Sequence, residues 1–275
     1  MRSLGPRFII ALVIAAISAA TYFSRSEKNE ITGEVQRVSI SQEQEVALGL
    51  QAMPEMGAQF GGEVQDAEIN NYVEQVGQKL ARQAGSASTP YKFDFHVLRD
   101  PRTINAFALP GGQVSITMGL LTKLQNEAEL AGVLGHEIAH VMARHGAEHL
   151  AKQQLTQGLI GAVGVAAYDP QNPSASTAAI AAAVGQLVSM RYGRNDELES
   201  DALGVKFMKE AGYDPRGMVS LMKVLAEGGS GGRQPEFFST HPDPGNRVAR
   251  LEEFIRQNGG PGGDLGAERF RRVVR

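Results

Sequence analysis

Apolar residues recur at helical spacing in several separate stretches of this 275-residue chain. Residues 42–60 and 66–84 show this spacing, and later helices are predicted to continue through Lys209 and to cover residues 215–227 and 246–257. Strand-like alternation is confined to Tyr91–Val97 and Gln113–Thr117. The pattern therefore predicts an α+β fold that is mostly helical, with a small antiparallel or mixed sheet beside the apolar helix that begins near Asn126.

That apolar helix contains the segment His136-Glu137-Ile138-Ala139-His140. Asn126 and Glu129 predict a capping box at its start, and the apolar pattern extends to about Gln154. Residues four apart share a helical face, so His136 and His140 can bind one metal ion while Glu137 faces a metal-bound water. The alternative, two histidines on a solvated face, is disfavoured because the flanking residues are apolar.

A second pair, His145 and His149, has the same spacing on the same predicted helix. It lies about half a turn away from His136, and no glutamate directly follows His145. We expect these two histidines to support the site from behind or to lie at the surface, and not to bind the metal.

A catalytic zinc site needs a third protein ligand, and the segment 194–202 offers one. Glu197 and Asp201 are four apart and share a helical face, whereas Glu199 points away from it. We therefore expect Glu197 to bind the metal and Asp201 to accept the distal N–H of a ligand histidine. Acidic residues are also common in the first turn of an ordinary helix, so this segment depends on the histidine motif for its interpretation.

These motifs together resemble the gluzincin zinc metallopeptidases of the BepA, LoiP and HtpX type, the family that includes the CAAX prenyl protease. The shared features are HEIAH followed by VMARHG, the E-x-x-x-D-A segment after an arginine, Asn105–Gly112 with Gly119–Leu121, and Ser239–Pro242. The segments Thr32–Glu34 and Glu43–Glu45 are similar to the start of the exported BepA-like members. The resemblance covers about residues 30–255, and it departs at Gly193, where many members have serine.

The resemblance implies a zincin-type domain that binds one Zn²⁺ per chain through His136, His140 and Glu197. In the expected reaction, Glu137 takes a proton from the zinc-activated water and returns it to the leaving nitrogen. His241, in the Ser-Thr-His-Pro motif, could donate a hydrogen bond to the oxyanion. It could instead occupy the open zinc position and hold the enzyme latent, or it could be a structural loop histidine. Tyr192 and Arg247 are weaker candidates for the oxyanion donor.

The strand Gln113–Thr117 is expected to be the edge of the sheet, where an extended substrate could pair with its backbone. The predicted substrate-binding residues are Gly112, Gln113, Val114, Ser115 and Ile116. Small residues at 111 and 112 would permit a close approach, or they could serve only the turn.

Composition narrows the functional classes without identifying one. With 27 basic and 30 acidic side chains the formal charge is −3, so we expect no nucleic-acid partner. The chain has no cysteine, which excludes disulfides, thiolate zinc ligands and a cysteine nucleophile.

The N-terminus indicates export. Arg2 and Arg7 precede an uncharged run over residues 8–24, typical of a signal peptide or a membrane anchor. We expect residues 1–24 to be that segment, 25–39 a linker, 40–258 the metallopeptidase domain and 259–275 a loosely held, Gly-rich then basic tail. The Ala- and Gly-rich segment 158–190 reads as two short helices.

The sequence thus predicts an exported metalloendopeptidase of the periplasm or cell envelope that acts on misfolded or misassembled envelope proteins. It would be anchored in the inner membrane if the N-terminal segment is uncleaved. Its partners would be protein or peptide substrates, with the membrane as a further partner if the N-terminal segment is retained. The alternative is a non-catalytic, zinc-stabilised chaperone or binding protein, which would not need Glu137.

Overall fold

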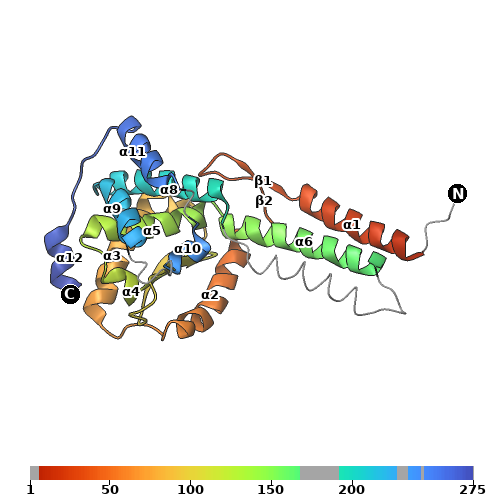
Figure 1. The fold of residues 1–275 in the computed structure, drawn as a ribbon, viewed down its shortest axis with the longest axis horizontal. Coiled ribbons are helices and arrows are strands. Elements are labelled where there is room, and N and C mark those ends of the chain that lie inside the picture. The colour runs from red at the N-terminus through yellow and green to blue at the C-terminus, as the bar shows by residue number, and fades with distance from the viewer. Residues whose placement is uncertain (1–5, 168–191, 228–234, 243–244, 275) are drawn as a thin grey trace. The chain divides into compact units, whose positions relative to one another are not determined.

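The computed structural model describes residues 6–167, 192–227, 235–242 and 245–274 of the chain (Figure 1). Within this part, contacts divide the protein into two compact units. The first comprises residues 1–40 and 146–190, and the second comprises residues 41–145 and 191–275, as far as each is described. The sequence had predicted one domain over residues 40–258, whereas residues 146–190 are grouped with the first unit.

The first unit is built from the N-terminal helix, a short hairpin and a long helix. Its elements are α1 (Pro6–Ser24), β1 (Ser26–Lys28), β2 (Val35–Arg37) and most of α6 (His145–Ala167). The two short strands pair antiparallel, so part of the expected linker is a hairpin. Helices α1 and α6 run side by side in opposite directions (Figure 1), with Ser18 against Gly158. Residues 168–190 of the expected small-residue helices lie outside the described residues.

The second unit has a mostly helical architecture around one small sheet, which confirms the predicted fold class. Its helices are α2 (Gln42–Gln59), α3 (Ala67–Gln83), α4 (Met118–Leu121), α5 (Glu127–Met142), α8 (Arg194–Glu210), α9 (Arg216–Glu227), α10 (Phe237–Thr240), α11 (Arg247–Gln257) and α12 (Ala267–Val273). A 3₁₀ turn, η1, covers Ser86–Ser88. All residues of α5 are buried, so this helix forms the centre of the unit.

The sheet contains β3 (Asp94–Leu98), β4 (Ala106–Leu109) and β5 (Gln113–Thr117), in the order β3-β5-β4. Strand β5 pairs parallel with β3 and antiparallel with β4. The expectation that Gln113–Thr117 forms an edge is therefore wrong. Strand β3 and the short strand β4 (Ala106–Leu109), which lacks clear polar alternation, take the two outer positions.

The HExxH helix ends earlier than the sequence predicted. Asn126 caps α5 by accepting the backbone N–H of Glu129, as expected. The Glu129 carboxylate, however, accepts from the backbone of Gln125 and from the side chain of Asn126, so the expected reciprocal box is not formed. The helix stops at Met142 because Arg144 adopts a left-handed conformation with φ 58°, and α6 begins at His145.

The C-terminal tail is docked, which corrects the expectation that it is loosely held. Phe270 of α12 is buried, and its ring lies 6.3 Å from that of Tyr72 on α3. Arg269 forms an ion pair with Glu127 at the start of α5, with Nε 2.9 Å from Oε2. The glycine-rich chain before α12 thus brings a basic residue back to the central helix.

Candidate metal centre

Helix α5 presents His136 and His140 on one buried face. Their rings lie edge to face, and the two Nε2 atoms are 3.1 Å apart. This is the arrangement that four-residue spacing on a helix predicts. Both side chains are almost fully buried.

Helix α8 brings a carboxylate to these imidazoles. A close approach between Gly135 of α5 and Gly204 of α8 permits this, since a Cβ on Gly204 would lie 3.2 Å from the backbone of Gly135 and His136. Glu197, in the first turn of α8, then lies with one oxygen 3.5 Å from Nε2 of His136 and the other 3.5 Å from Nε2 of His140. Glu197, about sixty residues further along the chain, therefore lies beside the two histidines, as the sequence predicted.

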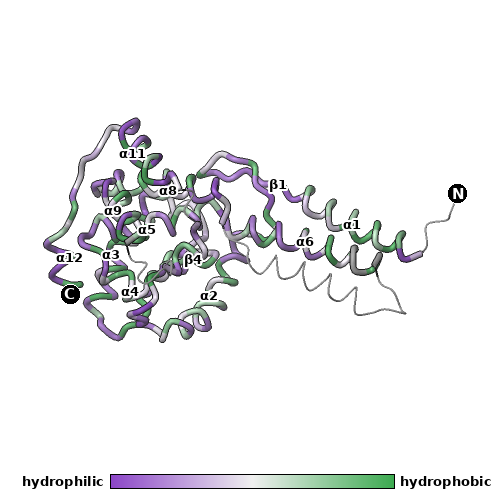
Figure 2. Tube along the Cα trace, viewed as in Figure 1, coloured by the Kyte–Doolittle hydropathy of each residue, from purple (hydrophilic) through white to green (hydrophobic). Residues whose placement is uncertain are grey.

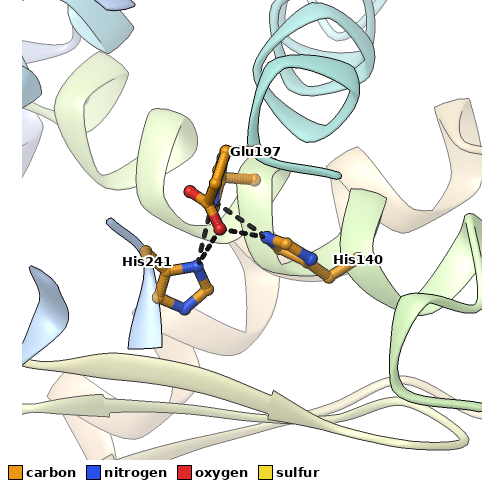
Figure 3. Close-up of side chains that lie close together, drawn as sticks. His140, Glu197 and His241 are labelled. Carbon is orange, nitrogen blue, oxygen red and sulfur yellow. Dashed lines mark hydrogen bonds and ion pairs between the residues drawn. The ribbon is translucent and has the colours of Figure 1, made fainter. Parts of the chain in front are cut away.

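A third imidazole reaches the same point from α10. His241 ends this short helix and stacks on Phe237, with ring centroids 4.5 Å apart. Its Nδ1 lies 3.1 Å from Oε1 of Glu197 and 3.4 Å from Nε2 of His136. Figure 3 shows the Glu197 carboxylate between the imidazoles of His140 and His241.

The four side chains fit a divalent metal ion. One ligand atom from each of His136, His140, Glu197 and His241 lies within 4.8 Å of the other three, and all four residues are buried. Three imidazoles and one carboxylate are a donor set typical of zinc. Glu137, Glu197 and Asp201 with the guanidinium of Arg247 leave two formal negative charges in this buried region, which a divalent cation would balance.

The carboxylates behind the cluster are tied to one arginine. Asp201 lies 3.1 Å from Nδ1 of His136, and it accepts two hydrogen bonds from Arg247, of 2.8 and 2.6 Å. The remaining terminal nitrogen of Arg247 lies 2.9 Å from Oε2 of Glu197. Arg247 therefore contacts both Glu197 and Asp201, a position suited to orienting carboxylates and not to the oxyanion role considered from the sequence.

The electrostatic environment favours positive charge on His136 and disfavours it on His140. Burial opposes protonation of His136, but the hydrogen bonds with Asp201 and Glu197 outweigh it and raise the pKa of His136 to about 9. Burial likewise acts to raise the pKa of Glu197, but hydrogen bonds with the three imidazoles lower it. Burial lowers the pKa of His140 well below its ordinary value.

Two further groups face the cluster. Glu137 is buried, and its Oε1 makes no hydrogen bond among the described residues and lies 3.6 Å from Nε2 of His241. The ring of Tyr192 lies 4.1 Å from that of His140. Glu137 thus places beside the ligand set a carboxylate oxygen that has no hydrogen-bond partner among the described residues, a position suited to a general base.

His145 lies behind the cluster, one of the two positions expected for it, and it contacts Glu199. His145 is buried, with Nδ1 2.9 Å from Nδ1 of His140 and Nε2 3.0 Å from Oε2 of Glu199. Glu199 does point away from the four-ligand cluster, as expected, but it contacts the histidine behind that cluster. The i, i+5 relation of His140 and His145 gave no sign of this contact, because it depends on the break at Arg144.

The residues predicted to bind substrate are not exposed. All of β5 is buried between its two neighbours. Gly111 lies against the backbone of α2, where a Cβ would come within 2.3 Å of Cα of Val46, and Gly112 lies against the backbone of Lys92 and Phe93. These glycines therefore serve the turn and its packing.

Comparison with known proteins gives consistent matches. Residues 67–255 match the sequence model of peptidase family M48. The chain is 35% identical over 199 residues to the putative beta-barrel assembly-enhancing protease of Vibrio cholerae serotype O1, covering 70% of this chain and 40% of that protein. It is 34% identical over 202 residues to the beta-barrel assembly-enhancing protease of Escherichia coli K12, with the same coverage.

A mitochondrial relative aligns over more of its own length. The metalloendopeptidase OMA1 of Schizosaccharomyces pombe is 31% identical over 237 residues, which cover 85% of this chain and 68% of that protein. The chain thus spans about two fifths of the length of the first two bacterial relatives. The matched region includes His136, His140, Glu197 and His241.

Proposed function

This chain is a member of peptidase family M48, and we propose that it is a zinc-dependent metalloendopeptidase of the cell envelope. The observation that carries the proposal is the convergence of His136, His140, Glu197 and His241 within 4.8 Å beside the buried carboxylate of Glu137. The proposed substrates are misfolded or misassembled envelope proteins, a choice supported by relatives named beta-barrel assembly-enhancing proteases.

In the proposed mechanism, His136, His140 and Glu197 hold one zinc ion. The ion they would hold would supply Lewis acidity, lowering the pKa of water and polarising the scissile carbonyl. Glu137 accepts the proton of the attacking water and delivers it to the leaving nitrogen. Asp201 orients His136, and Arg247 holds both Asp201 and Glu197, so the ligands keep their geometry while the proton moves.

We assign His241 a restraining role in the resting enzyme. Its Nδ1 lies as close to Glu197 and His136 as the ligand atoms lie to one another, and the residue is buried. An imidazole at this point would occupy the position that water and substrate require. His241 would therefore have to leave before catalysis, and donation to the oxyanion remains the competing role.

Strand β4, one of the two outer strands of the sheet, is the proposed platform for an extended substrate. It pairs only with β5 among the described strands, and its residues contact α5. An edge strand offers backbone N–H and C=O groups to a peptide, whereas a central strand does not. This proposal replaces the sequence-based prediction that Gly112 to Ile116 bind the substrate.

The N-terminal helix is proposed to be a retained membrane anchor. Within the described residues, α1 is the one helix long and apolar enough to span a bilayer, and Figure 2 shows the hydropathy of its residues. Its large apolar side chains are about half exposed. Its C-terminal turn also joins the hairpin, because the guanidinium of Arg37 lies 5.6 and 5.1 Å from the rings of Tyr22 and Phe23. Cleavage near Ala20 would remove most of α1 from this arrangement. Intact-mass analysis of carbonate-washed membranes tests for the uncleaved form.

The decisive experiment compares the purified wild-type protein with Glu137→Gln on unfolded casein while zinc content is measured on the same samples. The amide keeps the shape of the side chain but cannot accept a proton, so turnover should fall by about 10³-fold with zinc and fold unchanged. Glu129→Gln, on the same helix and outside the ligand cluster, is the matched control. Near-normal cleavage by Glu137→Gln, or a wild type with no zinc-dependent cleavage, would contradict the proposal.

The non-catalytic alternative predicts different behaviour. A zinc-stabilised binding protein would hold unfolded chains equally well with glutamate or glutamine at position 137. Mass spectrometry of envelope proteins that accumulate in cells carrying Glu137→Gln, compared with wild-type cells, separates the two functions and identifies candidate substrates.

A further inference from the structure

His145 is a buried histidine to which the proposed mechanism gives no part. Its Nδ1 lies 2.9 Å from Nδ1 of His140, and its Nε2 lies 3.0 Å from Oε2 of Glu199. The hydroxyl of Ser200 lies 3.4 Å from the same Nδ1. Both ring nitrogens of His145 are therefore engaged, one toward a candidate metal ligand and one toward a carboxylate whose side chain is 26% exposed.

This contact exists only because the chain leaves the helix before His145. Five residues along a continuous α-helix turn the side chain by about 500°, which would leave His145 about 140° from His140. Arg144 breaks the helix with φ 58°, a left-handed conformation that is unfavourable for a non-glycine residue. The break turns the chain so that His145 faces back toward the ring of His140.

A buried ion pair holds the break in place. Two nitrogens of Arg144 lie 2.7 and 2.6 Å from Oε1 of Glu45 on α2, and both side chains are almost fully buried. The hydroxyl of Tyr91 donates to the other oxygen of Glu45 at 3.1 Å. Three separate segments therefore fix the conformation at Arg144, as strained positions require.

The geometry also determines where the protons lie. His140 presents Nε2 to the cluster, where it is 3.1 Å from Nε2 of His136 and 3.5 Å from Glu197. A neutral imidazole that binds a metal through Nε2 carries its proton on Nδ1. That proton points at Nδ1 of His145, which must accept it. The proton of His145 is then on Nε2, and it is donated to Glu199.

We propose that His145 is a positioning residue for the metal centre, which accepts the Nδ1–H of His140 and extends the hydrogen bond to Glu199. His136 is oriented by one carboxylate, Asp201, at 3.1 Å. His140 is instead oriented by an imidazole and a carboxylate in series. This chain fixes the tautomer and the ring orientation of the second ligand, and such partners contribute about 10- to 100-fold to metal affinity. The inference rests on the proposed zinc site.

The test measures zinc affinity by chelator competition in the full-length protein. His145→Leu removes both hydrogen bonds and should weaken zinc binding by about 10- to 100-fold. His145→Asn can present its amide oxygen to His140 and should recover part of the affinity. Glu199→Ala should weaken binding, whereas Glu199→Gln keeps an acceptor for His145 and should stay closer to wild type. His149→Leu, one turn further along α6, is the control.

A second readout separates positioning from a general loss of structure. The visible spectrum of the cobalt-substituted protein reports ligand geometry, so it should change in His145→Leu and return toward wild type in His145→Asn. Thermal unfolding of the metal-free proteins monitors the fold. Wild-type zinc affinity in a folded His145→Leu protein would overturn the inference.

Other outcomes are also decisive. If His145→Leu does not fold, equal zinc affinities of Glu199→Ala and the wild type overturn the inference instead. If the wild type binds no zinc, the proposed function fails and takes this inference with it. The wild type could instead show normal zinc-dependent cleavage while substitutions at His145 and Glu199 leave zinc affinity unchanged. That result would leave the proposed function intact and reject only the role of His145.

Discussion

The two halves of α5 are equally buried, but their polar side chains are paired in opposite ways. In the N-terminal half, each carboxylate faces donors. Glu127 accepts from Tyr72 at 2.7 Å and from Arg269 at 2.9 Å, and Glu129 accepts from Ser220 at 2.5 Å. In the C-terminal half, the candidate ligand atoms of His136 and His140 converge with those of Glu197 and His241, all within 4.8 Å of one another.

The contrast distinguishes a structural polar cluster from a metal site. Buried polar groups are normally matched donor to acceptor, because an unmatched one costs the desolvation of that group. The N-terminal half satisfies this rule with protein groups alone. In the C-terminal half, metal-ligating atoms converge, and the proposed cation supplies the positive charge that Arg247 does not fully provide. The two halves should therefore respond differently to the same kind of substitution.

The largest expected effect is on catalysis, from the C-terminal half. Glu197→Ala should lose stoichiometric zinc, as measured by metal analysis after gel filtration, because it removes one of the three proposed ligands. Lewis-acid stabilisation is worth several kcal/mol, so casein turnover should fall by at least about 10³-fold. Glu127→Ala is the matched control and should keep its zinc. Full zinc occupancy in Glu197→Ala would show that the ligand assignment is wrong.

The next effect is on stability, from the N-terminal half. Glu127→Ala leaves the partly buried hydroxyl of Tyr72 without its acceptor and Arg269 without one of its carboxylates. Because the Arg269 side chain is half exposed, we expect a loss of about 2–3 kcal/mol, below the full cost of breaking a buried pair. Urea unfolding of the zinc-loaded protein measures it. A change below about 0.5 kcal/mol would indicate that the tail contributes little to holding α5.

A smaller effect is expected at His241. If His241 restrains the resting site, His241→Ala should raise casein cleavage several-fold with zinc content nearly unchanged, because the open position becomes accessible. If it donates to the oxyanion, the same substitution should lower the turnover rate, by as much as about 10²-fold for one lost donor. Intact mass after storage would add self-cleavage as a second readout. Unchanged activity would return His241 to a structural role.

Local spacing predicted much of the site, because its main parts lie on regular helices. His136, Glu137 and His140 follow from one helical turn, and the four-residue interval of Glu197 and Asp201 correctly placed both on the side of α8 that faces the histidines. The strand Gln113–Thr117 was also predicted with its observed bounds. In each case the periodicity of the element carries the information.

The features that were missed depend on contacts between distant segments. The helix break at Arg144 is fixed by Glu45, which precedes it by 99 residues, and no glycine marks it. The position of β5 at the centre of the sheet depends on β4, whose sequence Ala-Phe-Ala-Leu has no polar alternation. The docking of the tail depends on Phe270 and Arg269 reaching α3 and α5.

The smallest expected effect is a difference in pH dependence that belongs to the N-terminal half. Burial acts to raise the pKa of Glu127, but hydrogen bonds from Arg269 and Tyr72 outweigh it and lower the pKa below its ordinary value. A carboxyl with a lowered folded-state pKa contributes stability above its unfolded pKa of about 4.3, and this contribution is lost as pH falls through the folded value.

The wild type should therefore lose more unfolding free energy than Glu127→Gln on acidification, and the difference should develop below about pH 4.3. Metal-free samples of both proteins should be compared, since zinc release from the C-terminal half would otherwise add its own acid dependence. If the two proteins lose stability in parallel between pH 6 and pH 3, the Glu127 carboxylate is not preferentially stabilised in the folded state. The polar cluster at the N-terminal half would then hold α5 by packing and neutral hydrogen bonds alone, and the charge contrast between the two halves of the helix would be confined to the metal centre.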